Sequence, residues 1–172
     1  MGLPYFFFGT LMDGDVLARV LARPVAPTEL TPALLWGHRR HAVLGTVYPM
    51  LRPDPSGHVA GVVFHPAQAE ERARIDHFEA DEYVAAPHRV QIGTRLGTAL
   101  VYVGLDGVLR PAAAGWCLAT WRASHKADYL RRCDGWMADY EPVLGTGAEA
   151  ADAGAGAEFG WCRQRRAIRA YR

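Results

Sequence analysis

A run of acidic residues near the middle of the chain is the first place where side-chain types and spacing suggest chemistry. Asp76, Glu79, Asp81 and Glu82 alternate with apolar residues such as Phe78. A carboxyl group flanked by apolar side chains and other acids can have its pKa raised toward neutrality, and it can then act as both general base and general acid. The alternative is a solvated helix end, although acidic residues there oppose the helix dipole. The run by itself leaves both interpretations open.

A second candidate lies near the N-terminus, where the aromatic run 5–8 leads into Gly9–Leu11. Four consecutive aromatic residues predict a strand that is apolar on both faces and therefore central in a sheet. Gly9 allows a positive φ or a close approach of the backbone to a ligand, and Asp13 can cap a helix that runs to about Leu21. Backbone N–H groups at such a turn suit a carboxylate; an ordinary turn after a central strand is the alternative.

Composition and missing motifs exclude several classes of function. The net charge of +1 provides no basic field for nucleic acid or a membrane surface. Cys117, Cys133 and Cys162 form no C-x-x-C pair, so we expect neither a disulfide framework nor a zinc site. The chain has no dinucleotide-binding, P-loop, serine-hydrolase or zinc-protease motif, and we expect no metal or cofactor. Without a signal peptide or a long apolar run, we expect a cytoplasmic protein with no membrane partner.

The elements that would hold the candidate residues follow from turn signals and hydrophobic patterning. A helix is expected from Pro66 to about Phe78, which places the acidic run at its end. Gly37 is expected to form a turn, residues 48–57 a loop, and Gly61 a point where a side chain would obstruct a neighbour. Strands are expected over residues 33–36, 41–47, 58–64, 83–92 and 96–103. These elements predict an α+β fold, a small mixed or antiparallel β-barrel flanked by helices.

The chain is expected to divide into a barrel domain over residues 1–105 and two C-terminal segments. Residues 106–143 are expected to hold a linker and one long amphipathic helix from Trp116 to about Tyr140, because apolar residues recur there at spacings of three and four. The helix would pack on the barrel or on a partner chain, which allows a homodimer. Residues 144–172 are expected to be a flexible Gly/Ala linker followed by an arginine-rich segment.

Five short motifs occur in one order along residues 5–104. They are an aromatic strand ending in Gly-Thr-Leu, then Tyr-Pro-Met-Leu, Val-x-Gly-Val-Val-Phe, Ile-Asp-His-Phe-Glu-x-x-x-Tyr and Ala-Leu-Val-Tyr-Val. In these motifs the chain resembles the gamma-glutamylcyclotransferase-like family, which includes the AIG2-like proteins. The resemblance implies a small mixed barrel flanked by helices, in agreement with the fold predicted from patterning.

The resemblance also implies a function and a set of site residues. A gamma-glutamyl amide or amine would be the small-molecule substrate, converted to 5-oxoproline with release of the amine and without a cofactor. By this resemblance Glu79 is the catalytic acid and base. The residues that would bind substrate are Phe8, Gly9, Thr10, Leu11, Tyr48, Tyr83 and Tyr102. Phe8 stands where the family usually has tyrosine. The alternative is a module that keeps the barrel but only binds a small molecule or a protein partner.

Overall fold

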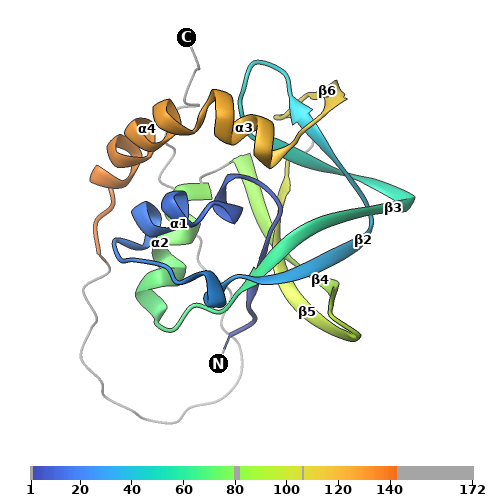
Figure 1. Ribbon diagram of the computed structural model, residues 1–172, viewed down its shortest axis with the longest axis horizontal. Coiled ribbons are helices and arrows are strands. Elements are labelled where there is room, and N and C mark those ends of the chain that lie inside the picture. The colour runs from blue at the N-terminus through green and yellow to red at the C-terminus, as the bar shows by residue number, and fades with distance from the viewer. Residues whose placement is uncertain (1, 80–81, 106, 143–172) are drawn as a thin grey trace, which may run out of the picture.

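The computed structural model describes residues 2–79, 82–105 and 107–142, which form a β-barrel with helices on one side of it (Figure 1). The predicted strands at 83–92 and 96–103 are confirmed as β4 and β5. The strands are β1 (Tyr5–Phe7), β2 (Thr31–Val43), β3 (Pro49–Phe64), β4 (Tyr83–Ile92), β5 (Arg95–Gly104) and β6 (Pro111–Gly115). The helices are α1 (Gly14–Leu21), α2 (Ala69–Glu79), α3 (Leu118–Ser124) and α4 (Lys126–Ala138), with short 3-10 turns at Thr10–Met12 and Pro27–Glu29.

The barrel closes because each of five strands has two neighbours. The order is β3-β1-β5-β4-β2, and β2 also pairs with β3, while β6 adds to the outer end of β2. The pairing of β1 with β5 is parallel and the remaining pairings are antiparallel. This arrangement confirms the predicted α+β fold with a mixed barrel.

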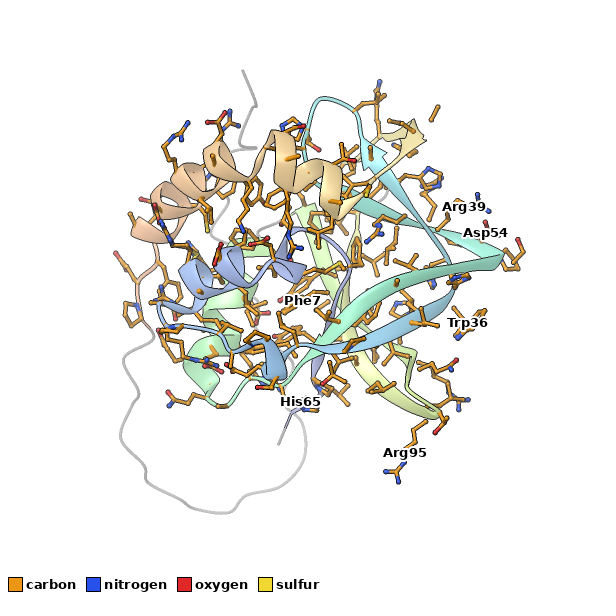
Figure 2. The ribbon with its side chains drawn as sticks, in the orientation of Figure 1. Phe7, Trp36, Arg39, Asp54, His65 and Arg95 are labelled. Atoms are coloured by element: carbon orange, nitrogen blue, oxygen red, sulfur yellow. The ribbon has the colours of Figure 1, made fainter. Side chains whose placement is uncertain are left out.

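The aromatic strand is central in the sheet, as its composition predicts. Tyr5, Phe6, Phe7 and Phe8 are each no more than 6% exposed. Tyr5 and Phe7 pack with the helices, whereas Phe6 and Phe8 point into the barrel interior. Figure 2 shows Phe7 in the middle of the molecule, between the strands and the helices. The strand therefore joins the two halves of the core and carries Gly9–Leu11 between them.

The prediction of a turn at Gly37 and a loop over residues 48–57 is wrong. β2 runs through Gly37, which has a φ of 75° at a bulge, and most of residues 48–57 belong to β3. The prolines in this stretch indicated a loop, but pairing with β2 overrides that local preference. Beside this bulge Arg39 Nε donates to Asp54 Oδ2 at 2.7 Å, at the outer edge of the barrel (Figure 2).

The single long helix predicted over 116–140 is also wrong, because it is broken into α3 and α4 at His125. The backbone of His125 has φ −129° and ψ −20°, which is not helical. The break turns Trp121 and Tyr129 toward the same core, where their rings meet edge to face at 5.2 Å. The expected linker before this helix contains the short strand β6, and the segment predicted over 144–172 lies outside the described residues. None of the helices in the described residues is long and apolar enough to cross a membrane.

Asp13 caps α1, as predicted, and also ties α1 to the later helices. Its carboxylate accepts from Asp15 N, from Arg122 Nε at 2.6 Å and from Lys126 Nζ at 3.0 Å. The side chain is 1% exposed, and this burial alone would raise its pKa. The hydrogen bonds from Arg122 and Lys126 outweigh burial and hold the pKa of Asp13 below its ordinary value. Asp13 therefore links α1 to α3 and α4 through ion pairs.

Candidate active site

Glu79 is the last residue of α2, and it is partly buried beside two other carboxylates. Burial, together with the negative charges of Asp76 and Glu82, raises the pKa of Glu79 to about 8. Within the described residues no hydrogen bond reaches its carboxyl group. A carboxyl group of this kind holds a proton near neutral pH, and no described residue accepts that proton in a hydrogen bond. It is therefore suited to proton transfer with a ligand.

Two predicted tyrosines, Tyr83 on β4 and Tyr102 on β5, lie close enough to Glu79 for its charge to act on both. Burial first, and then the charge of Glu79, raises the pKa of each phenol. Tyr83 Oη donates to the carbonyl of Pro49 at 2.9 Å, and Tyr102 Oη donates to Asp76 Oδ1. Both tyrosines are therefore neutral, and their hydroxyl protons point to protein acceptors. Their oxygen lone pairs remain available to a ligand.

Tyr48, the third predicted tyrosine, reaches the same group of side chains from the segment before β3. Its hydroxyl donates to Glu82 Oε2 at 2.7 Å, and its ring meets Tyr83 edge to face at 6.3 Å. Glu82 is one of the two carboxylates that raise the pKa of Glu79. Tyr48 therefore fixes the position of a charge that acts on Glu79.

Of the two reasons for glycine that the sequence left open in the Gly9–Leu11 turn, a positive φ is excluded. Gly9 has φ −122° and not a positive φ, so left-handed geometry is not the reason for glycine. The reason is a close approach to protein, because a Cβ on Gly9 would lie 3.1 Å from the ring of Pro49. Leu11 is 2% exposed and packs in the core. Its main-chain N–H and that of Thr10 donate to no acceptor in the described part of the chain. A ligand at this turn would therefore contact mainly main-chain atoms.

Two chains of contacts connect the turn to the neighbourhood of Glu79. The first runs from Gly9 through the Pro49 ring to Tyr83, whose hydroxyl bonds the Pro49 carbonyl. The second begins at Thr10, whose Oγ1 lies 3.1 Å from Tyr129 Oη. Tyr129 in turn lies close enough to Tyr83 for an electrostatic interaction that raises the pKa of Tyr83. The structure thus brings the turn, Glu79 and the three tyrosines into one region.

Phe8 is the predicted site residue whose side chain lies elsewhere. It points into the barrel interior with Phe6 and Leu35, and its carbonyl oxygen accepts from Arg40 Nη1 at 2.7 Å. The tyrosine that the family usually has at this position would have to place its hydroxyl in an apolar cluster here. A binding role for Phe8 stays a prediction and would have to involve its main chain.

A sequence model of the gamma-glutamyl cyclotransferase, AIG2-like family matches residues 5–121. The chain belongs to this family. AIG2-like protein A of Arabidopsis thaliana is 25% identical to it over 131 residues, which cover 73% of the chain and 75% of that protein. AIG2-like protein C of the same plant is 35% identical over 78 residues, covering 45% of the chain and 44% of that protein.

Several solved structures share the fold of this chain. Two A. thaliana proteins determined in solution superpose with TM-scores of 0.56 and 0.57 at 23% and 22% identity. The superpositions cover 81% and 87% of this chain and 94% and 95% of those proteins. A structure described as a gamma-glutamyl cyclotransferase superposes with a TM-score of 0.50 at 14% identity over 86% of this chain and 93% of that one. At these identities the likeness shows the fold.

Two residues near Glu79, Tyr5 and Tyr129, were missed by sequence reasoning. Tyr5 Oη donates to Asp76 Oδ1 at 3.0 Å, on the oxygen that also accepts from Tyr102. Asp76 was noted in the acidic run, and its spacing of three residues before Glu79 signals a shared helix face. Tyr129 lies in α4, beyond the residues that the family model matches, and no local pattern distinguishes it from a packing residue.

A surface depression of about 480 Å³ beside α1 shares no residue with the group around Glu79. Its charged side chains pair with one another, including Lys126 Nζ with Asp15 Oδ2 at 2.7 Å. Among the described residues no cluster of three or more His, Cys, Asp or Glu side chains could hold a metal ion. Glu79 therefore remains the acid/base candidate with the strongest support.

Proposed function

We propose that the protein is a cyclotransferase that converts a gamma-glutamyl amide or amine to 5-oxoproline and releases the amine. The observation that carries the proposal is the Glu79 carboxyl group, whose pKa is about 8 and which has no hydrogen-bond partner among the described residues. Membership of the gamma-glutamyl cyclotransferase, AIG2-like family supports it independently.

The proposed reaction needs one group that both accepts and donates a proton. The Glu79 carboxylate takes a proton from the α-ammonium of the substrate, and the freed amine nitrogen attacks the γ-carbonyl carbon. A C–N bond forms within a five-membered ring, and the C–N bond to the departing amine breaks. Glu79 then returns this proton to the departing nitrogen. The ring nitrogen loses its second proton to solvent as the lactam forms, and the released amine takes up a proton from solvent to become ammonium. A carboxyl group with a pKa of about 8 suits both halves of this exchange.

The reaction is intramolecular, so holding the folded substrate conformer supplies much of the acceleration. In the proposal the main-chain N–H groups of Thr10 and Leu11 bind the α-carboxylate. Tyr83 and Tyr102 present oxygen lone pairs toward the ammonium, since both hydroxyls donate to protein acceptors. An enzyme nucleophile is not required, because the substrate supplies its own.

The test is to incubate the protein with a panel of gamma-glutamyl peptides and gamma-glutamyl amines and to assay 5-oxoproline by mass spectrometry. We expect 5-oxoproline and an equal amount of released amine from at least one member of the panel. If no member yields product above the rate without protein, the cyclotransferase proposal fails. The alternative of a non-catalytic binding module then gains support.

The raised pKa of Glu79 predicts how the activity depends on pH. Because the deprotonated carboxylate starts the reaction, kcat/KM should fall about tenfold per pH unit below the pKa of Glu79 in the free protein. That limb should bend at a pH of about 8. The measurement is kcat/KM between pH 5 and 9 with the best substrate of the panel. If kcat/KM stayed level down to pH 5, the pKa of Glu79 would lie near that of free glutamate, about 4.3, and Glu79 would be solvated during the reaction.

A further inference from the structure

Arg40 on β2 is a partly buried cation without a carboxylate partner in the described residues. Its Nη1 donates to the Phe8 carbonyl at 2.7 Å, and its guanidinium lies 5.2 Å from the centre of the Trp116 ring. Neither Nε nor Nη2 reaches an acceptor within the part of the chain that the structure describes. Burial lowers the pKa of Arg40, and the opposing contribution comes from Cys117 and not from an acid. Donors on the Nε–Nη2 edge are thus unused.

An uncompensated cation at a partly buried site is unusual, because buried charges are normally paired. Two other partly buried arginines of this protein follow the rule. Arg23 pairs with Glu29 at 2.8 Å and with Glu71 at 2.6 Å, and Arg74 pairs with Glu70 at 3.8 Å. The anion that would pair with Arg40 is therefore not among the described residues, and a bound ligand could supply it.

The position of Arg40 indicates what that anion would be. Its Nη1 contacts the Phe8 carbonyl on one side of the Gly9–Leu11 turn and lies 3.6 Å from Met12 Sδ on the other side. The guanidinium therefore lies beside the turn in which the main-chain N–H groups of Thr10 and Leu11 have no acceptor among the described residues. The neighbourhood of Glu79 also contains Asp76 and Glu82, and these negative charges would oppose an incoming carboxylate. A cation beside the turn offsets that opposition.

We propose that Arg40 binds the α-carboxylate of the ligand, with the Nε–Nη2 edge of its guanidinium donating to both carboxylate oxygens. The assignment of this carboxylate to a gamma-glutamyl group rests on the proposed function. Arg40 is then a substrate-binding residue that acts together with the main chain of the turn. Two parallel N–H···O bonds are the arrangement in which arginine holds carboxylates most specifically.

The test measures binding to the full-length protein by isothermal titration calorimetry with two probes, 5-oxoproline and 2-pyrrolidinone. The two compounds share the lactam ring, and 2-pyrrolidinone lacks the carboxylate. We expect Arg40→Gln to weaken 5-oxoproline binding by about 10- to 100-fold, because a charge-assisted bidentate contact is lost. Arg40→Lys should recover part of the affinity, and neither substitution should change the weaker binding of 2-pyrrolidinone.

Arg39→Gln is the matched control, because it removes a neighbouring guanidinium whose side chain is 62% exposed and paired with Asp54. Its 5-oxoproline affinity should equal that of the wild-type protein. An NMR correlation spectrum of each variant verifies that the fold is retained. A folded Arg40→Gln protein with wild-type affinity for 5-oxoproline would overturn the assignment, and so would a wild-type protein that binds both probes equally or binds neither.

Kinetics separate this proposal from the proposed function. If the panel yields product, Arg40→Gln should raise KM more than it lowers kcat, since the α-carboxylate does not change during the reaction. If the panel yields no product but 5-oxoproline binds in an Arg40-dependent way, the carboxylate site stands and the cyclotransferase proposal fails. If Arg40→Gln formed product with an unchanged KM, the cyclotransferase proposal would stand and the proposed role of Arg40 would be excluded.

Discussion

Glu79→Gln is expected to lower 5-oxoproline formation by about 10²- to 10⁴-fold, the range that general acid–base catalysis contributes in enzymes. The glutamine amide has nearly the shape of the glutamic acid, but it can neither accept a proton from the ammonium nor return one to the departing amine. The measurement is kcat/KM at pH 8 with the best substrate of the panel. Equal rates in the variant and the wild-type protein would exclude Glu79 as the acid and base.

The stability of the same variant provides its control. The folded-state pKa of Glu79, about 8, lies above the unfolded value. The stability that the protonated Glu79 side chain contributes to the fold is therefore fully present below pH 4. It is lost as the pH rises toward 8 and the buried carboxyl group ionises. Glutamine does not ionise, so Glu79→Gln should gain roughly 3–5 kcal/mol over the wild type by pH 9 and little at pH 4. Urea denaturation at both pH values measures this difference. An inactive variant that is more stable at pH 9 cannot owe its inactivity to unfolding.

Gly61→Ala is expected to destabilise the fold by about 3 kcal/mol, at the upper end of overpacking substitutions. A Cβ on Gly61 would lie 2.3 Å from the Phe7 carbonyl oxygen and 2.5 Å from the Phe6 ring, and the backbone oxygen cannot move without shifting β1. For a domain of this size such a loss corresponds to roughly 6–12 °C in Tm. Thermal unfolding followed by circular dichroism measures it.

Gly135→Ala is the matched control for this substitution. A Cβ on Gly135 would meet no heavy atom within 4 Å, and the residue lies inside α4. Alanine should therefore add about 0.5–1 kcal/mol of stability, because glycine is the poorer helix former. If Gly61→Ala unfolded at the wild-type temperature, the close contact between β1 and β3 would not exist in solution.

Much of the barrel could be predicted from the sequence, because its signals are local. The aromatic composition of residues 5–8 is enough to place a central strand, and alternation with turn signals is enough for β4 and β5. The obstruction expected at Gly61 is confirmed by the contacts a Cβ would make there. The β2–β3 ribbon could not be predicted, because the proline-rich stretch after Tyr48 becomes a strand only when β2 is beside it.

Arg40, for which we propose a carboxylate-binding role, shows why the rest of the site could not be predicted from the sequence. Simple alternation from the buried Leu35 would turn Arg39 inward and Arg40 outward. The register of β2 against β3 changes by three residues between Trp36 and His38, and beyond this bulge Arg39 is the exposed side chain and Arg40 the partly buried one. A bulge is a property of the paired strands, and one strand's sequence does not reveal it. Tyr129 was missed for a related reason, since its partner Thr10 is 119 residues away.

The central place of β1 also has a consequence for how the chain folds during synthesis. Its aromatic side chains leave the ribosome well before their partners, which are residues 62–64 on β3 and, in the parallel pairing, Leu100 on β5. At about 5–20 residues per second, β5 follows β1 by roughly 5–20 s. Until β5 emerges, one edge of this apolar segment with high strand propensity has no partner, and such segments aggregate when left unpaired. The strand that unites the finished core is therefore also a segment of the nascent protein that chaperones would protect.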